Sequence, residues 1–166
     1  FVGKTNSASI RRAVIAFDIA SQIPTGSTIK SVTLTLYMSR TTAEADTSKV
    51  HRLLADWGEG TSDTTGTEGR GTTSTSGDAT WIHRFFETDA WQTPGGDFST
   101  TAGASISVSG TGNYTWDSTD QLVADVQAWL DDPSSNFGWI LLGNEAGNQT
   151  AKRFDSKENN TAANWP

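Results

Sequence analysis

The stretch "KSVTLTLYMSR", residues Lys30–Arg40, decides the fold class of this chain. Apolar residues occupy every second position, and threonines and one tyrosine occupy the positions between them. Successive side chains of a β-strand point to opposite faces, so this alternation predicts a strand with one buried face and one solvated face. The apolar set is Val32, Leu34, Leu36 and Met38.

Similar short patterns lie on both sides of this strand. Upstream, "RRAVIAFDIA" (Arg11–Ala20) also alternates, and a turn containing Pro24 and Gly26 separates it from Lys30–Arg40. Residues 58–80 consist almost entirely of glycine, serine, threonine and acidic residues, which predicts a long loop. Further strands are expected within residues 49–57, 80–86, 104–110, 136–145 and 151–158.

One segment has helical spacing instead. Ser118 followed by Gln121 predicts a capped helix start, and Asp131-Asp132-Pro133 predicts its end, so we expect a short helix at about residues 119–130. Many short strands, one helix and no alternation of strands with helices predict an all-β fold. We expect a jelly-roll-like antiparallel β-sandwich that forms one domain over residues 1–166.

Composition excludes several classes of partner and site. The net charge is -7 and the isoelectric point is about 4.6, which disfavours nucleic acid because phosphate contacts need a basic surface. No apolar run approaches the length of a membrane span, so we expect no membrane insertion. The chain has no cysteine, which excludes disulfides, thiolate zinc sites and cysteine nucleophiles.

Several phrases together resemble the DNRLRE-type domain. They are "RRAVIAFDI" at 11–19, "DWGEGTSD" at 56–63, "NFGWILLGNE" at 136–145 and "KRFDSKEN" at 152–159, and the similarity extends over almost the whole chain. The resemblance implies a jelly-roll-like module of extracellular or cell-surface proteins of bacteria and archaea. It also implies a non-catalytic function, namely binding of polysaccharide or surface adhesion.

The chain departs from that pattern at both ends. The resemblance implies a strand before "FVGKTN" and an apolar strand after "ANWP", and without them sheet edges would be open. We therefore expect residues 1–166 to be a fragment of a longer chain, or a neighbouring chain to supply the missing strands. The second option gives an alternative function: a structural subunit of an extracellular filament, sheath or surface layer, assembled by strand addition as a homo-oligomer.

Four residues are candidate ligand contacts. Sugar rings stack on exposed aromatic side chains, and Trp91 and Tyr114 lie in polar, glycine-rich surroundings. In "KRFDSKENN", Arg153 and Asp155 would bind a sugar acid in one interpretation. In the other, these charges pair across strands while Phe154 lies in the core.

Structural calcium is the one cofactor for which the sequence offers ligands. Asp56, Glu59 and Asp63 lie in a glycine-rich loop and carry the oxygen ligands that calcium prefers, but their spacing is not that of an EF-hand. Alternatively, Trp57 anchors this loop and Glu59 binds backbone amides. The sequence contains no nucleophile elbow, and nothing singles out a catalytic pair of carboxylates, so we expect no enzyme activity.

Overall fold

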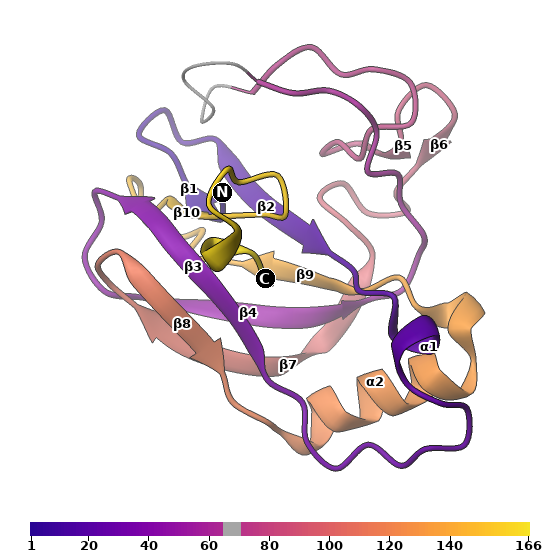
Figure 1. Cartoon of the computed structure of the whole chain (residues 1–166). Helices are drawn as coiled ribbons and strands as arrows, with labels where there is room; N and C mark the ends of the chain where they lie inside the picture. Colours follow the sequence, from indigo (N-terminus) through magenta and orange to yellow (C-terminus); the bar gives the residue numbers. More distant parts are fainter. Residues whose placement is uncertain (65–70) are drawn as a thin grey trace.

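The computed structural model describes residues 1–64 and 71–166 (Figure 1). Two antiparallel sheets form a sandwich-like, all-β fold, as the sequence predicted. The first sheet has the strand order β1 (Gly3–Lys4), β2 (Ile10–Ile15), β9 (Trp139–Leu142), β4 (Asp46–Leu53) and β7 (Phe98–Val108). The second has the order β10 (Lys152–Phe154), β3 (Leu34–Thr41) and β8 (Gly112–Trp116). A small hairpin pairs β5 (His83–Phe85) with β6 (Asp89–Ala90).

The alternation in Lys30–Arg40 correctly predicted β3. Leu34, Leu36 and Met38 are buried between the sheets, and Val32 is partly buried just before the strand begins. On the other face, Thr35 is exposed, and its Oγ1 lies 2.8 Å from Oγ1 of Thr115 on β8. Period-two patterning therefore set both the strand and the direction of its faces.

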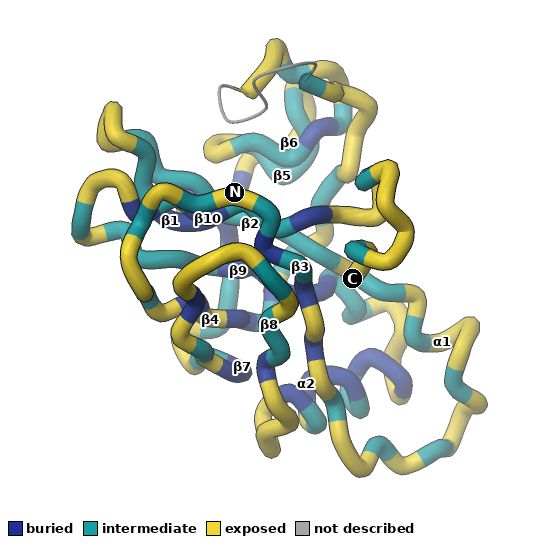
Figure 2. The backbone as a smooth tube through the Cα atoms, turned by 60° about the vertical axis from the view of Figure 1, so that its left-hand side comes forward, coloured by how far each residue is buried: buried dark blue, intermediate teal, exposed yellow. Residues whose placement is uncertain are grey.

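The main core lies between the two sheets and the helix that covers one end of the sandwich (Figures 1 and 2). Tryptophans from three elements meet there, and the rings of Trp129 and Trp139 pack edge to face with centroids 4.7 Å apart. Large aromatic side chains bury much area each, which lets a chain of modest hydrophobic content close its core. The other buried members are Val2, Leu34, Leu36, Val50, Ala104, Trp116, Leu122, Val126 and Leu141.

A second core cluster lies on the opposite face of the five-stranded sheet. Ile140 of β9 and Leu53 of β4 pack there against Trp91 from the long connection between β4 and β7. β9 reads "WILL" because both of its faces are covered: Trp139 and Leu141 face the main core, and Ile140 faces the second cluster.

The helix α2 (Asp120–Asp131) forms where its spacing predicted, but it begins one residue later than expected. Thr119 is the N-cap, and its Oγ1 accepts from the Leu122 amide at 3.0 Å. Ser118 instead accepts from the Val32 amide at 3.1 Å, and Gln121 donates to Asp125 at 2.9 Å. The capping box of Ser118 and Gln121 was therefore wrong, because other contacts take both side chains.

Four of the predicted strands are shorter than expected, including β9 and β10, which cover only part of residues 136–145 and 151–158. β2 ends at Ile15, and Asp18 caps a single helical turn, α1 (Ile19–Gln22), although Phe17 and Ile19 still pack against the main core. Within residues 80–86 only β5 is a strand. Two 3-10 turns, η2 (Pro133–Ser135) and η3 (Ala162–Asn164), complete the described elements. No helix in the described part of the chain is both long and apolar enough to span a membrane.

An extended segment joins the two sheets at one end. β1 pairs with β2 on one side, and on its other side Val2 pairs with Lys152 through two backbone hydrogen bonds of 2.9 Å. We call the line along which the edges of the two sheets face one another the seam. This stretch, Val2–Lys4 with Thr150–Phe154, is its tied half. The open half lies between Ala13–Phe17 on one side and Leu34–Tyr37 on the other, beyond the reach of β1 and β10.

Candidate functional site

The four predicted ligand residues do not form one site. Trp91 is only 6% exposed, packs against Leu53 and Ile140, and donates its Nε1–H to the Thr80 carbonyl at 2.9 Å. Its ring is enclosed, so it offers no open face on which a sugar could stack. The expectation that Trp91 is an exposed aromatic is corrected: it anchors the connection between β4 and β7.

Tyr114 serves the hairpin between β7 and β8. Its hydroxyl donates to the Gly110 carbonyl at 2.8 Å and accepts from the Ser109 amide at 3.0 Å. Hydrogen bonds from the side chain and backbone of Ser109 lower the pKa of Tyr114. The glycine-rich surroundings that singled it out in the sequence are those of a turn. A ligand contact by its ring stays a prediction.

The cluster "KRFDSKENN" is held by internal contacts. Lys152 is 2% exposed and donates from Nζ to the Glu44 carbonyl at 2.9 Å, and burial lowers the pKa of Lys152. Phe154 packs on Trp116 with ring centroids 5.7 Å apart. The placement of Phe154 in the core favours the structural interpretation of this cluster.

Arg153 and Asp155 share a partner on β3. Nε of Arg153 donates to Ser39 Oγ at 2.8 Å, and the Ser39 hydroxyl donates to Asp155 Oδ1. Asp155 is buried and also accepts from Asn164 Nδ2 at 3.1 Å. These contacts attach the C-terminal segment to β3. Binding of a sugar acid by this pair stays a prediction.

The predicted calcium ligands do not come together. Glu59 pairs with Lys157 at 3.0 Å rather than with loop amides, and Asp56 accepts from the adjacent Trp57 amide at 2.9 Å. Trp57 does anchor the loop, because its Nε1–H donates to the Phe137 carbonyl at 2.8 Å. Asp63 completes no ligand set, since the described residues contain no group of three or more acidic, histidine or cysteine side chains arranged to hold a metal ion.

A buried carboxylate that no sequence pattern predicted, Asp78, organises the long loop. Asp78 accepts from the amides of Thr75 at 2.6 Å, Thr61 at 3.0 Å and Ser62 at 3.3 Å. Burial opposes the charge, but these hydrogen bonds outweigh it and lower the pKa of Asp78 to about 2. Part of the loop predicted at 58–80, residues 65–70, lies outside the described residues.

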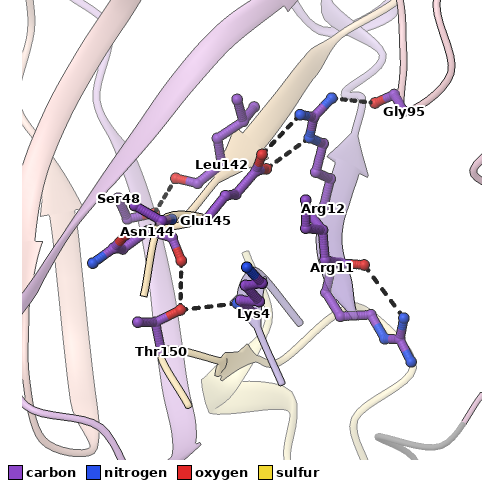
Figure 3. Close-up of polar contacts among 11 residues, drawn as sticks. Lys4, Arg11, Arg12, Ser48, Gly95, Leu142, Asn144, Glu145 and Thr150 are labelled. Atoms are coloured by element: carbon purple, nitrogen blue, oxygen red, sulfur yellow. Dashed lines mark hydrogen bonds and ion pairs between the residues drawn. The ribbon is translucent and has the colours of Figure 1, made fainter. Parts of the chain in front are cut away.

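An arginine that no sequence pattern predicted as a site residue, Arg12, joins three segments (Figure 3). The Arg12 guanidinium makes a bidentate ion pair with Glu145, at 2.7 and 2.9 Å, and donates to the Gly95 carbonyl at 3.0 Å. It also stacks on the Trp81 ring, 4.8 Å from the centroid. We call Arg12, Trp81, Gly95 and Glu145 the Trp81 platform. No local pattern could reveal it, because its members are dispersed along the chain.

The Trp81 platform presents a fixed and accessible aromatic ring. Trp81 is 40% exposed, and Ile82 beside it is also exposed. The ring lies against Gly95, where a Cβ atom would approach its Cζ2 and Cη2 atoms to 2.9 Å. Only glycine leaves room for the indole here, so position 95 fixes where the ring can lie.

Comparisons of the chain with models of protein families, with curated proteins and with solved structures found no match. The resemblance to the DNRLRE-type domain therefore stays a prediction based on the phrases quoted above.

Proposed function

We propose that this chain is a non-catalytic extracellular module that binds neutral polysaccharide at the Trp81 platform. One observation carries the proposal: the exposed indole ring of Trp81 stacks on the Arg12 guanidinium, and a bidentate ion pair with Glu145 holds that guanidinium in place. A sugar ring presents C–H groups that pack against an aromatic face, and its hydroxyl groups need hydrogen-bonding partners at the rim.

The platform is preorganised for such a ligand. Arg12 is held by Glu145 and by the Gly95 carbonyl, so the ring it stacks on loses little conformational freedom when a ligand binds. Both charged side chains keep partial exposure, 17% for Arg12 and 22% for Glu145, so their outer atoms can bond hydroxyl groups. The net charge of -7 repels polyanions, which favours a neutral glycan.

The distribution of titratable groups supports a binding module rather than an enzyme. Catalytic sites bring together groups whose pKa values are shifted for the reaction. Among the described residues, each of these shifted groups has a local structural reason: Asp78 holds a loop, while Lys152 and Tyr114, whose charges affect each other's pKa, tie two sheets and close a turn.

The test is retention on polysaccharides. Affinity gel electrophoresis with soluble hydroxyethylcellulose, xylan, mixed-linkage glucan and alginate, and pull-down on insoluble chitin, would compare wild type with Trp81→Ala. We expect retention by at least one neutral glycan and an approximately tenfold weaker affinity for Trp81→Ala, equivalent to about 1.4 kcal/mol.

Trp165→Ala is the matched control, because Trp165 is also exposed but lies far along the chain at the C-terminal segment. It should bind like wild type. Circular dichroism would check that both variants stay folded. Equal retention of Trp81→Ala and wild type, or retention by none of the five glycans, would contradict the proposal.

A further inference from the structure

The open half of the seam is a long apolar groove between the edges of the two sheets. One section, of about 810 Å³, runs between Phe17 and Leu34 over Val126 and Trp139. A second section, of about 410 Å³, runs between Ala13–Phe17 and Leu36. The two sections share Phe17, and Trp165 and Pro166 line both of them. Figure 1 shows β2 and β3 passing on either side of the C-terminus.

Both walls of this groove are strand edges. On β2, residues 12–15 pair with β9 on one side, while β1 on the other side reaches only Ile10 and Arg11. On β3, residues 34–38 pair with β8 on one side. On the other side, pairing with β10 extends from Thr41 to Met38, and a last hydrogen bond from the Asp155 amide to the Tyr37 carbonyl ends it. In the described part of the chain, no strand lies beside Ala13–Ile15 or Leu34–Leu36 within the groove.

The backbone of β3 presents hydrogen-bonding groups to the groove. The Tyr37 carbonyl points away from β8, because it accepts from the Asp155 amide at 2.9 Å. The N–H and C=O groups of one residue in an antiparallel strand point the same way, and the direction repeats every second residue. The N–H and C=O groups of Thr35 therefore point into the groove. The close contact of Thr35 and Thr115 side chains, 2.8 Å, agrees with a pair that does not share ladder hydrogen bonds.

The tied half shows that extended segments fill the space between β2 and β3, because β1 pairs with β2 there and β10 pairs with β3. There an extended segment of this chain, Val2–Lys4, lies between the sheets and pairs with β2 on one side and with Lys152 on the other. Val2 is fully buried in that position. The groove runs on along the same two strands, and its space beside β3 is the one that β10 occupies in the tied half.

We propose that the open half of the seam binds a partner β-strand with apolar side chains at every second residue. Its backbone would pair with the Thr35 edge, and its apolar face would cover Ile15, Phe17 and Val32, which are partly exposed. Its other face would be polar, because it faces solvent. This surface is separate from the Trp81 platform, so the two proposals can fail independently.

The probe is a fluorescein-labelled ten-residue peptide in which four valines alternate with four threonines between terminal lysines. Anisotropy would measure its binding to the intact chain. The control peptide has the same composition with its four valines consecutive, which removes the one-sided apolar face. We expect saturable binding of the alternating peptide, a rise in the melting temperature of the protein, and at least tenfold weaker binding of the control.

Two proline variants locate the site. Thr35→Pro removes the N–H that points into the groove, and proline is tolerated where a strand's N–H faces solvent. Thr115→Pro is the matched control: Thr115 pairs directly with Thr35, so its N–H points away from β3 at the opposite edge of the same sheet. We expect Thr35→Pro to weaken peptide binding at least tenfold and Thr115→Pro to leave it unchanged.

A third peptide keeps the test decisive if Thr35→Pro does not fold. It carries N-methyl groups on alternate residues, which block backbone pairing without altering side chains, and it should bind the wild-type chain at least tenfold more weakly. Equal binding of all three peptides, or of the alternating peptide to Thr35→Pro and wild type, would overturn the proposal. If the chain without peptide forms concentration-dependent dimers, and Thr35→Pro abolishes them, the occupant of the groove is a second copy of this chain and the partner-strand proposal is wrong.

Discussion

The tied and open halves of the seam have the same walls but different contents. In the tied half, where Val2–Lys4 lies between the sheets, Val2, Met38 and Lys152 are almost completely buried. In the open half, Ile15, Phe17 and Val32 pack against the same core but stay partly exposed. The difference teaches that the facing sheets bury Leu34 and Leu36 by themselves, whereas the apolar side chains at the rim of the groove stay partly exposed where no extended segment covers them.

The largest expected effect comes from a larger side chain at Gly3, in the tied half. Gly3 has φ of +101°, and a Cβ atom there would lie 2.9 Å from the Thr150 carbonyl oxygen. Gly3→Val should therefore push β1 away from Thr150 and lower the free energy of unfolding by about 3 kcal/mol, measured by urea denaturation.

The control for Gly3→Val is Gly26→Ala. Gly26 also has a positive φ, +81°, but a Cβ atom added there would meet no atom within 4 Å apart from its chain neighbours. Only the backbone cost remains, about 1 kcal/mol. Similar losses for the two variants would show that the tied half is not specially dependent on Gly3.

The second prediction concerns the floor of the open half. Asp125 is buried and accepts from Gln121 Nε2 at 2.9 Å and from Trp139 Nε1 at 3.0 Å. Asp125→Ala leaves the buried indole N–H unpaired, so we expect a loss of about 2 kcal/mol in the free energy of unfolding. Asp131→Ala is the control, because Asp131 accepts an equivalent bond from Gln127 on the exposed face of α2. It should unfold near the wild-type midpoint.

The third prediction concerns pH, and it contrasts the seam with the long loop. The pKa of Asp78 falls from 3.8 to about 2 in the folded chain, so its charged form stabilises the fold above about pH 4. That contribution is lost as the pH falls from about 4 to about 2. Asp78→Asn should cost about 1 to 2 kcal/mol at pH 7, because the new amide group faces backbone donors.

Two measurements check the Asp78 prediction. The stability difference between wild type and Asp78→Asn, followed by denaturation at several pH values, should shrink toward about pH 2. Hydrogen exchange should show the Thr61 and Thr75 amides losing protection over that range while the Val2 and Lys152 amides keep theirs. A difference that is independent of pH would contradict the assigned role of the charge.

The smallest expected effect comes from the ion pair between Lys157 and Glu59, which borders the open half. A hydrogen bond from Lys157 to Glu59 raises the pKa of that lysine, but the side chains are 62% and 63% exposed, so solvent screens the pair. Lys157→Ala should leave the unfolding midpoint within experimental error of wild type. A clear loss in the free energy of unfolding would show that this ion pair stabilises the fold more than an exposed pair is expected to.

Local pattern predicted the helix and most of the longer strands because their causes are local, but it missed β8 (Gly112–Trp116) and the two-residue strands β1 and β6. The alternation of Leu34, Leu36 and Met38 fixes which side of β3 is buried, and the spacing of Leu122, Val126 and Trp129 fixes the face of α2. One of the two interpretations of residues 152–160 also placed Phe154 in the core, and its ring packs against the main core. Local pattern misjudged Trp91. This residue lies in a distant loop that covers the second face of the five-stranded sheet, and such a loop has no periodic pattern of apolar residues.

The sequence by itself determined that this chain builds antiparallel sheets with one helix of three turns, because the spacing of apolar residues acts over a few residues. Only the tertiary structure decided which polar side chains hold it together and where it stays open. Arg12 finds Glu145 across 133 positions, Lys152 finds Glu44 across 108, and the edges of β2 and β3 come to face one another. Such meetings depend on how the sheets stack, and residues so distant in the chain leave no mark of their proximity in one sequence.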